Sequence, residues 1–512
     1  MAARVLFIGL DATQATLLEG GFGGGPLPGL RSLGEAGMRA RLGNRIDTLP
    51  DAVWPELATG RSAGKAPLYC PTRQLHTGEA VPRPVSESDA NPEAHFPTVA
   101  ARAGKRVATI DLPYAVPVRG LGGVQLVEWG THEPWLGVRS EPPAFLDGVR
   151  ARYGDNAVRR CDLVQGGTPS DYERLLDELL ADIERKRHLL GDLLQESDWD
   201  LVAACFTEAH CAGHQFWSLY DETHPLHGEH APPRLRDALV LVYRALDDAV
   251  ADLVSRAGPD ATVVVVASHG MGPHVGGDLL LPVVLERLGL GPRRARLAQV
   301  RGSLGGRARR VWRRSLPEPL RARVNKRLNV ATERLDRRGT RAVALENNQC
   351  GAIRLNVIGR EPTGTVAPGA EADRLIEELR RELLALVDPE CGEPIVRAIA
   401  TADEAFGADH HPDVPDLMVA FRAGLAPIEA CASPSIGEVR APLYRPFAGG
   451  GTADWPTRPR TGDHTGESRL WMRGPGIAPD PRLRTGDVLD VAPTLLSLLD
   501  VPLPSWLDGS VL

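Results

Sequence analysis

The sequence predicts an α/β fold in which helices cover both faces of a central, mostly parallel sheet. Short runs rich in β-branched and other apolar residues recur along the chain, and stretches with helical patterning lie between them. Most of these runs are apolar on both faces, as central strands of a parallel sheet are. With 512 residues and 43% hydrophobic content, the chain can bury a large core.

The expected elements follow from these patterns in chain order. The predicted strands occupy residues 4–10, 106–112, 200–206, 262–267, 352–358, 416–421 and 468–473. The predicted helices occupy residues 169–194, 234–257, 371–387 and 489–499. Ser170 and Glu173 can cap the first of these helices. The helices at 169–194 and 234–257 each lead directly into a strand, which is typical of crossovers between parallel strands.

Residues 286–345 differ in composition from the rest of the chain because arginine is dense there, around Arg307 and Arg321. We interpret this segment as an inserted cap between two parts of the core, 1–285 and 346–512. A solvated helical face explains the arginines without any function. There are two functional alternatives: the arginines form a rim that attracts anions to an active site, or they form a surface that touches anionic lipid.

Charge and cysteine usage limit the partners and the compartment. A net charge of −7 is mild for this length, so no nucleic-acid partner is expected. The first apolar run, residues 5–10, is too short for a signal peptide or a membrane span, so no transmembrane segment is expected. Seven cysteines without a CxxC pair indicate thiols in a reducing compartment. We therefore expect a cytoplasmic protein, and the sequence leaves its oligomeric state unknown.

Polar residues follow two of the predicted strands directly. Asp11 comes after strand 4–10, at the kind of strand end where ligands bind in open α/β sheets, although an Asp there is often only a helix cap. His210 and His214 come after strand 200–206. On a helix they share one face and can ligate one metal ion through their imidazole nitrogens.

Two further histidines lie in glycine-rich segments. Ser268 and His269 follow strand 262–267, and Asp463 and His464 precede strand 468–473. A lone histidine at such a place is more often a hydrogen-bonded structural residue. Together with Asp11, however, these nitrogen and oxygen donors suit a transition ion rather than calcium. The sequence therefore predicts a site for one or two divalent ions, zinc in the first place, with manganese also compatible.

The order of these motifs resembles the type I phosphodiesterase/nucleotide pyrophosphatase family of the alkaline phosphatase superfamily. The matching segments are Gly9–Asp11, Trp54–Gly60, His210–Trp217, Ser268–Gly272, Asn356–Val366, Pro415–Val419, Gly462–His464 and Asp490–Leu496. The resemblance implies an alkaline phosphatase-like fold and two divalent ions. One ion would have Asp11, His269 and the nucleophile as ligands, and His210, His214 and His464 would surround the other. The two ions would clamp the attacking and leaving oxygens of an in-line displacement by a Thr or Ser hydroxyl.

The chain departs from the family pattern at three positions. His210 and Ser268 stand where the family usually has Asp, which removes two negative charges and favours one ion or a different ion. The expected nucleophile position, counted back from Thr59, falls at about Pro50. Thr48 is the nearest hydroxyl and is the predicted nucleophile. Attack by water without a covalent intermediate, loss of hydrolysis, and a role of Thr48 as a turn hydroxyl stay open.

Supporting residues are predicted less directly. Asn347 and Arg360 are the candidate substrate-binding residues, although Asn347 and Asn348 can equally cap a strand entry. Glu208 and Asp463 are candidates for orienting the ligating imidazoles. Weaker candidates for the site are His76, His274, His410 and His411.

These observations predict a metal-dependent hydrolase of small-molecule phosphate esters, either phosphodiesters or phosphomonoesters, acting by in-line displacement. Sulfate esters are a second substrate class. One alternative is a catalytically degenerate protein that keeps the fold and binds a metal or an anion. The other is a transferase that moves a phosphoryl-linked group to an acceptor alcohol.

Overall fold

A computed structural model describes most of the chain. The described residues are 4–20, 22, 27–65, 90–132, 137–156, 161–164, 167–196, 198–228, 231–292, 339–345, 347–422, 427–441 and 460–512. Most of the predicted arginine-rich cap lies outside them, and so does His76.

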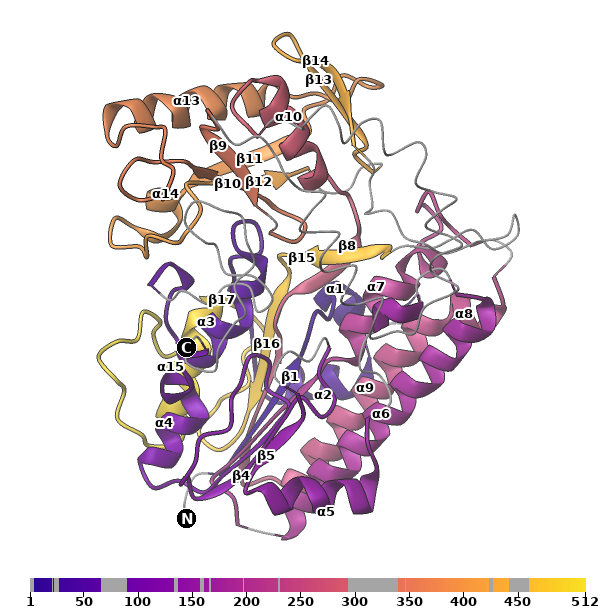
Figure 1. The fold of residues 1–512 in the computed structure, drawn as a ribbon. Coiled ribbons are helices and arrows are strands. Elements are labelled where there is room, and N and C mark those ends of the chain that lie inside the picture. The colour runs from indigo at the N-terminus through magenta and orange to yellow at the C-terminus, as the bar shows by residue number, and fades with distance from the viewer. Residues whose placement is uncertain are drawn as a thin grey trace, which may run out of the picture.

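A nine-stranded sheet forms the centre of the fold (Figure 1), in the order β17-β2-β16-β7-β1-β6-β3-β4-β5. Neighbouring strands from β7 to β4 run parallel, and β16 runs antiparallel to both β7 and β2. The strands are β1 Arg4–Leu10, β2 Met38–Gly43, β3 Val107–Ile110, β4 Gly123–Val127, β5 Arg139–Glu141, β6 Leu201–Phe206, β7 Ala261–Ala267, β16 Ser468–Arg473 and β17 Leu483–Asp487. The predicted mostly parallel α/β sheet is confirmed.

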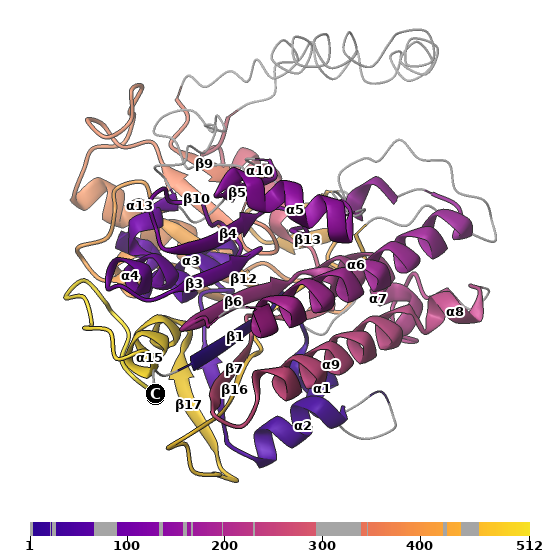
Figure 2. The same cartoon turned by 90° about the horizontal axis from the view of Figure 1, so that it is seen from below.

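Helices cover both faces of this sheet (Figure 2) because β1 is apolar on both sides. Leu6, Ile8 and Leu10 pack into one large apolar cluster, and Val5 and Phe7 pack into another. The first cluster includes residues of α2 Pro28–Glu35, α6 Pro169–Glu196, α7 Glu208–Tyr220, α8 Pro233–Arg236 and α9 Ala238–Ala257. The second includes residues of α3 Val53–Thr59, α4 Phe96–Arg102 and α15 Val491–Leu498. The first cluster also includes residues of α1 Ala15–Gly20 and α5 Pro143–Tyr153.

A smaller antiparallel sheet of order β11-β12-β10-β9 has a core of its own. Its strands are β9 Ala342–Leu345, β10 Gly351–Leu355, β11 Val396–Thr401 and β12 Leu417–Phe421. The helices α10 Leu281–Arg287, α13 Ala370–Leu384 and α14 Ala402–Phe406 lie in the same part of the chain. Two ribbons complete the described strands, β13 Ala430–Ser433 with β14 Gly437–Arg440, and β8 Gly270–Pro273 with β15 Gly462–Thr465.

The predicted strands and helices agree with the structure in type. The strands at 352–358 and 416–421 correspond to β10 and β12, which belong to the smaller sheet rather than the central one. The predicted helix 234–257 is two helices, α8 and α9. The sequence did not indicate β2, in which apolar residues alternate with polar ones. It did not indicate β17 either, whose large apolar residue, Leu483, is exposed.

Strand directions bring remote segments to one edge of the central sheet. The parallel strands β1, β6 and β7 all end at this edge. Because β16 is antiparallel to β7, it begins there, and β2 ends there because it is antiparallel to β16. The loops after β1, β2, β6 and β7, and the segment before β16, therefore leave the sheet on the same side. The β8–β15 ribbon lies at this edge, between the two sheets in Figure 1.

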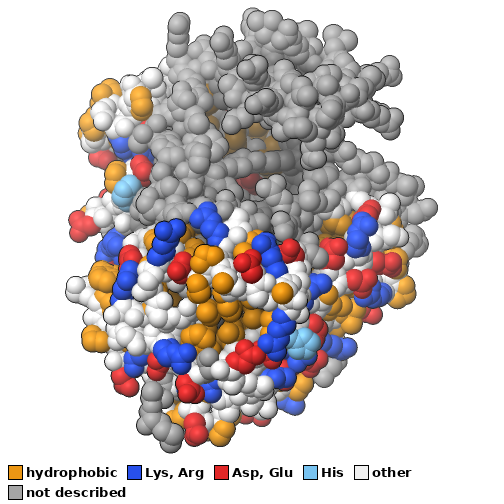
Figure 3. Space-filling view, turned by 60° about the horizontal axis from the view of Figure 1, so that its bottom comes forward, with side chains coloured by type: hydrophobic (Ala, Val, Ile, Leu, Met, Phe, Trp, Pro, Cys, Tyr) orange, Lys and Arg blue, Asp and Glu red, His pale blue; other side chains and the backbone are white. Residues whose placement is uncertain are grey.

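The described surface agrees with the mild net charge of the chain. Basic and acidic side chains are interspersed around a group of hydrophobic ones on the described part of the face in Figure 3. Among the described residues, no helix combines the length and the apolar character needed to cross a membrane.

Candidate metal centre

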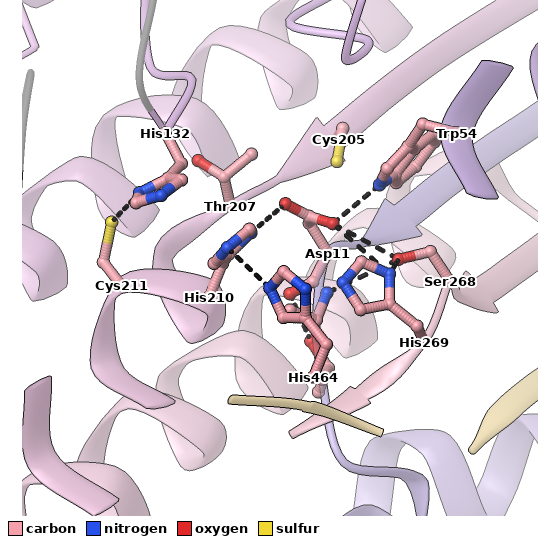
Figure 4. Close-up of polar contacts among 12 residues, drawn as sticks. Asp11, Trp54, His132, Cys205, Thr207, His210, Cys211, Ser268, His269 and His464 are labelled. Carbon is pink, nitrogen blue, oxygen red and sulfur yellow. Dashed lines mark hydrogen bonds and ion pairs between the residues drawn. The ribbon is translucent and has the colours of Figure 1, made fainter. Parts of the chain in front are cut away.

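Asp11 follows β1 and is almost completely buried. Its Oδ1 accepts hydrogen bonds from Trp54 Nε1 at 2.6 Å and from Ser268 Oγ at 3.3 Å, and its Oδ2 lies 2.6 Å from His210 Nδ1 (Figure 4). Burial opposes ionisation, but the His210 and His269 rings and the Trp54 bond hold the pKa of Asp11 well below its usual value. Asp11 is therefore an ionised carboxylate that fixes the ring of His210.

Close packing against a glycine brings Trp54 to this carboxylate. The indole lies over Gly9 of β1, where a Cβ atom would come within 2.4 Å of Trp54 Cη2. Trp54 belongs to α3, which follows the turn after β2 and the short helix η1 Pro50–Ala52. Glycine at position 9 thus permits the hydrogen bond between Trp54 and Asp11.

His210 and His464 face each other across the site. His210 is on the first turns of α7, directly after β6, and His464 is on β15. Their Nε2 atoms are 3.0 Å apart, and His210 turns its Nδ1 toward Asp11. Two nitrogen ligands on one tetrahedral zinc ion are about 3.3 Å apart. This pair of nitrogens is therefore spaced to hold one ion between them.

His269 brings a third imidazole to this pair from the end of β7. Its Nδ1 lies 3.0 Å from Ser268 Oγ. Among the described residues, the buried His269 Nε2 and His464 Nδ1 have no hydrogen-bond partner. One nitrogen from each of His210, His269 and His464 lies within 4.8 Å of the others. Buried ring nitrogens without partners are costly unless a ligand satisfies them.

The imidazoles are held in their neutral, metal-binding form. Burial lowers the pKa of His210 to about 4, with the nearby His132 ring adding to the effect against the opposing pull of Asp11. Burial also lowers the pKa of His269 and takes the pKa of His464 well below its usual value. Neutral imidazole is the form that ligates metals. The residues present therefore fit a divalent transition ion.

A second group of donors shares His464 with the first. His214, Asp463 and His464 each offer one ligand atom within 4.8 Å of the others. The guanidinium of Arg460 lies against His214, where its Nε donates to His214 Nδ1 at 2.8 Å. Its Nη2 lies 3.5 Å from Asp463 Oδ1. Asp463 also contacts His274 Nδ1 at 2.7 Å. Although burial opposes ionisation, Arg460 and His274 lower the pKa of Asp463 to about 2.

Thr48 lies in the turn after β2, at the same edge of the sheet. Its side chain is partly exposed, and its Oγ1 donates to the Arg45 carbonyl at 3.1 Å. Asn347 Nδ2 donates to the Thr48 carbonyl at 2.6 Å, so this predicted substrate-binding residue fastens the turn that carries the predicted nucleophile. Pro50, where the family resemblance places a hydroxyl, begins η1 and is buried.

Other predicted residues have partners away from the histidine group. Arg360 makes two 2.7 Å contacts to the Asp416 carboxylate, and its Nε donates to Glu361 at 3.0 Å. Glu208 pairs with a buried lysine, Lys186, at 3.1 Å. The weaker candidates His410 and His411 pair with Asp403 and Asp413.

The sequence-based prediction missed three residues beside this site. His132 follows β4, and its ring stacks on His210 with centroids 4.1 Å apart. Cys211 lies 3.2 Å from His132 Nδ1, and Cys161 lies 3.5 Å from the same nitrogen. The rule that ligands gather at strand ends would have indicated His132, and Cys211 stands between two predicted ligands in the sequence.

The fold is a mostly parallel α/β sheet that gathers a buried carboxylate and several imidazoles at its carboxyl edge. The chain belongs to the type I phosphodiesterase/nucleotide pyrophosphatase family, whose model matches residues 5–434. It is a phosphoric ester hydrolase of the alkaline phosphatase superfamily. The predicted family and enzyme class are confirmed.

Several solved structures are similar to this chain. Murine ectonucleotide pyrophosphatase/phosphodiesterase 5, as an inactive variant in complex with AMP, has a TM-score of 0.49 at 11% identity, with 99% of this chain and 97% of that chain covered. Phosphonoacetate hydrolase from Sinorhizobium meliloti 1021, in complex with phosphonoformate, has a TM-score of 0.48 at 13% identity, with 98% and 96% covered. Wild-type alkaline phosphatase PafA has a TM-score of 0.46 at 12% identity, with 100% and 98% covered. No curated protein sequence matches the chain.

Proposed function

We propose that the chain hydrolyses small-molecule phosphate esters, either phosphodiesters or phosphomonoesters, and that His210, His269 and His464 hold the divalent ion it requires. One observation carries this proposal. Three imidazoles, buried or mostly buried, each offer a nitrogen within 4.8 Å of the others, and buried ring nitrogens of His269 and His464 have no hydrogen-bond partner among the described residues. Zinc suits a site of imidazole nitrogens, and manganese is the alternative.

The ion would supply positive charge to the phosphoryl oxygens and would lower the pKa of the attacking group. The carboxylate of Asp11 would orient the His210 ring toward the ion, as carboxylates commonly do for metal-bound histidines. Trp54 and Ser268 in turn hold Asp11 in place. A direct ligand role of Asp11, as the resemblance implies, stays a prediction.

We assign to Arg460 the second positive charge of the site. His210 and Ser268 stand where the family usually has carboxylates, so the site holds less negative charge for a second ion. The Arg460 guanidinium lies against His214 and near Asp463, which are the donors a second ion would need. A guanidinium pairs well with phosphate oxygens. One bound ion and Arg460 would then neutralise the phosphoryl group together.

Thr48 is the proposed nucleophile. Its turn leaves the sheet at the same edge as Asp11 and His269, and its hydroxyl is partly exposed. Thr48 Oγ would lose its proton and bond to phosphorus while the bond to the leaving oxygen breaks, and that oxygen would take up a proton to leave as the alcohol. Water would then hydrolyse the phosphothreonine and restore the Thr48 hydroxyl. Asn347 supports this role by fastening the Thr48 carbonyl.

The test uses the purified chain with zinc or manganese and three reporters. We expect cleavage of bis(p-nitrophenyl) phosphate or p-nitrophenyl phosphate, and weaker cleavage of p-nitrophenyl sulfate. A metal-loaded protein that cleaves none of them, yet is stabilised against heat by phosphate, would instead favour an anion-binding protein without catalysis. Activity that depends on an added alcohol would favour a transferase.

The nucleophile has its own control. Thr48→Ala should reduce turnover at least about 100-fold, because the covalent step is lost. Thr223 is a matched turn threonine whose hydroxyl donates to Asp221 at 2.7 Å, and Thr223→Ala should keep full activity. Full activity in Thr48→Ala would assign the attack to water.

The compartment follows from cysteine chemistry and also stays a proposal. None of the six cysteines in the described ranges forms a disulfide, which supports a cytoplasmic protein.

A further inference from the structure

Beside the candidate metal centre lies a second cluster of donors, formed by His132, Cys161 and Cys211. Three separate segments supply them: the loop after β4, the short helix η5 Cys161–Val164, and α7. One ligand atom from each residue lies within 4.8 Å of the others. Figure 4 shows Cys211 pointing at the His132 ring from the side away from Asp11.

The distances in this cluster match those of a zinc site. His132 Nδ1 lies 3.2 Å from Cys211 Sγ and 3.5 Å from Cys161 Sγ. In a tetrahedral site with Zn–S near 2.3 Å and Zn–N near 2.05 Å, a nitrogen and a sulfur ligand are about 3.5 Å apart. Both nitrogen–sulfur distances therefore suit two ligands of one such ion, and the two sulfurs lie within 4.8 Å of each other.

The surroundings of the two sulfurs also suit a bound ion. Cys161 and Cys211 are 1% and 3% exposed, so they are shielded from bulk solvent. Gln215 Nε2, one turn along α7 from Cys211, donates to Cys161 Sγ at 3.6 Å. A donor aimed at a sulfur stabilises thiolate charge, and thiolate is the form that binds metal.

We propose that His132, Cys161 and Cys211 bind a thiophilic divalent ion such as zinc, at a site separate from the phosphate-ester centre. Each thiol would lose its proton to solvent as its sulfur donates an electron pair to the ion. Two thiolates select a softer ion than the imidazole group does. The ion would fasten η5 and the loop after β4 to α7.

The site would also position the catalytic pocket. The His132 ring stacks on His210, with centroids 4.1 Å apart and planes at 26°. An ion on His132 Nδ1 would hold the His132 ring in place. The His132 ring would then hold the orientation of the His210 ring that stacks on it. A ring nitrogen of His132 also lies within 4.8 Å of ring nitrogens of His210 and His214. The two cysteines are therefore the better residues for a test, because they belong only to the proposed second site.

The experiment replaces the bound metal of the full-length chain, kept under anaerobic conditions, with cobalt(II). Cobalt bound to thiolate has a sulfur-to-metal absorption band in the near ultraviolet, which cobalt on imidazole and carboxylate alone lacks. We expect this band in the wild-type protein, and its loss together with one equivalent of metal in Cys161→Ser and Cys211→Ser. The matched control is Cys391→Ser, since Cys391 is exposed and should leave the band unchanged.

Two results would overturn the proposal. One is a cobalt-loaded wild-type protein without the band, a readout that does not depend on how well any variant folds. The other is a Cys161–Cys211 disulfide found by mass spectrometry in anaerobically purified protein. His464→Ala should keep the band while it loses hydrolysis, so failure of this site and failure of the phosphate-ester centre are distinguishable.

Discussion

Two buried polar clusters adjoin the end of β6, and they differ in whether the basic nitrogens at their centres have partners. In the first, Lys186 is fully buried and lies 3.1 Å from Glu208 and 3.6 Å from Asp111. Its Nζ also donates to the Gly130 and Cys205 carbonyls at 3.2 and 3.0 Å. Burial disfavours the charge, but Glu208 and Asp111 more than compensate and raise the pKa of Lys186. This cluster is closed, because the lysine has carboxylate and carbonyl partners on several sides.

The imidazole group of His210, His269 and His464 is open by comparison. Two of its buried nitrogens, His269 Nε2 and His464 Nδ1, have no hydrogen-bond partner in the described part of the chain. Glu208 and His210 are only two residues apart on α7, yet they belong to different clusters. We therefore infer that the lysine cluster serves folding, and we propose that the histidine cluster keeps donor atoms for a ligand.

The open cluster should tolerate loss of a histidine in folding but not in catalysis. His464→Ala should lower kcat/KM for the phosphate reporter on the order of 10⁴-fold, or about 5 kcal/mol, because an ion ligand is lost. The thermal midpoint should stay within a few degrees of the wild-type value. The control is His188→Ala, a substitution at a side chain that is 55% exposed. Activity within tenfold of wild type would show that His464 is not a ligand.

The closed cluster should respond in the opposite way. Lys186→Met leaves Asp111 and Glu208 buried without their cation and should lower the free energy of unfolding by about 3–4 kcal/mol. Urea unfolding measures this change. Lys65→Met, at a 43% exposed lysine that pairs with Asp508, should cost less than about 1 kcal/mol. Equal effects of the two substitutions would show that the closed cluster stabilises the fold no more than a surface ion pair does.

Glu56 is a third case, a buried carboxyl only partly compensated by charge, since Arg45 Nε lies 4.0 Å away. Burial raises the pKa of Glu56 to about 7, against the opposing effects of Arg45 and the Ala63 hydrogen bond. Folding therefore favours the protonated acid. Its contribution to stability is complete below the unfolded pKa of about 4.5 and is lost as the pH rises through about 7.

Glu56→Gln should remove this pH dependence. The variant should be about 2 kcal/mol more stable than wild type at pH 8 and nearly equal to it near pH 4.5, as urea unfolding at both pH values would measure. A stability difference that does not change with pH would show that Glu56 keeps its ordinary pKa in the folded protein.

The smallest effect is expected at Arg460. Arg460→Gln should raise KM for the phosphate reporter about tenfold, because one charged contact to the phosphoryl oxygens is lost. The amount of bound metal should not fall. Arg482→Gln, at an 83% exposed arginine, is the matched control. If the Arg460→Gln variant instead binds a second equivalent of metal and its activity rises, Arg460 does not serve as the second positive charge in catalysis. It would then only block a second metal site.

Strand-end position alone predicted much of the fold and the site. Asp11, His210, His269 and His464 could be predicted to lie together because each lies near the end or the start of a predicted strand. Parallel pairing of β1, β6 and β7 and antiparallel pairing of β16 with β7 bring those points to one edge. His132 was missed although it follows β4, since that strand is short and only partly buried.

Contacts between remote segments could not be predicted in the same way. The hydrogen bond between Trp54 and Asp11 depends on how α3 packs over Gly9. Arg360 was predicted to bind substrate, but its guanidinium pairs with Asp416, which is 56 residues away in the sequence. Residue type alone does not reveal whether a cation already has such a partner.

Removal of metal is the decisive measurement for the open cluster. Treatment with a chelator, checked by elemental analysis, should abolish hydrolysis of the phosphate reporter in the wild-type protein, and stoichiometric zinc or manganese should restore it. The same addition should not restore His269→Ala or His464→Ala. Full hydrolysis by a protein that holds less than about a tenth of an equivalent of any divalent metal would contradict a catalytic ion at these histidines.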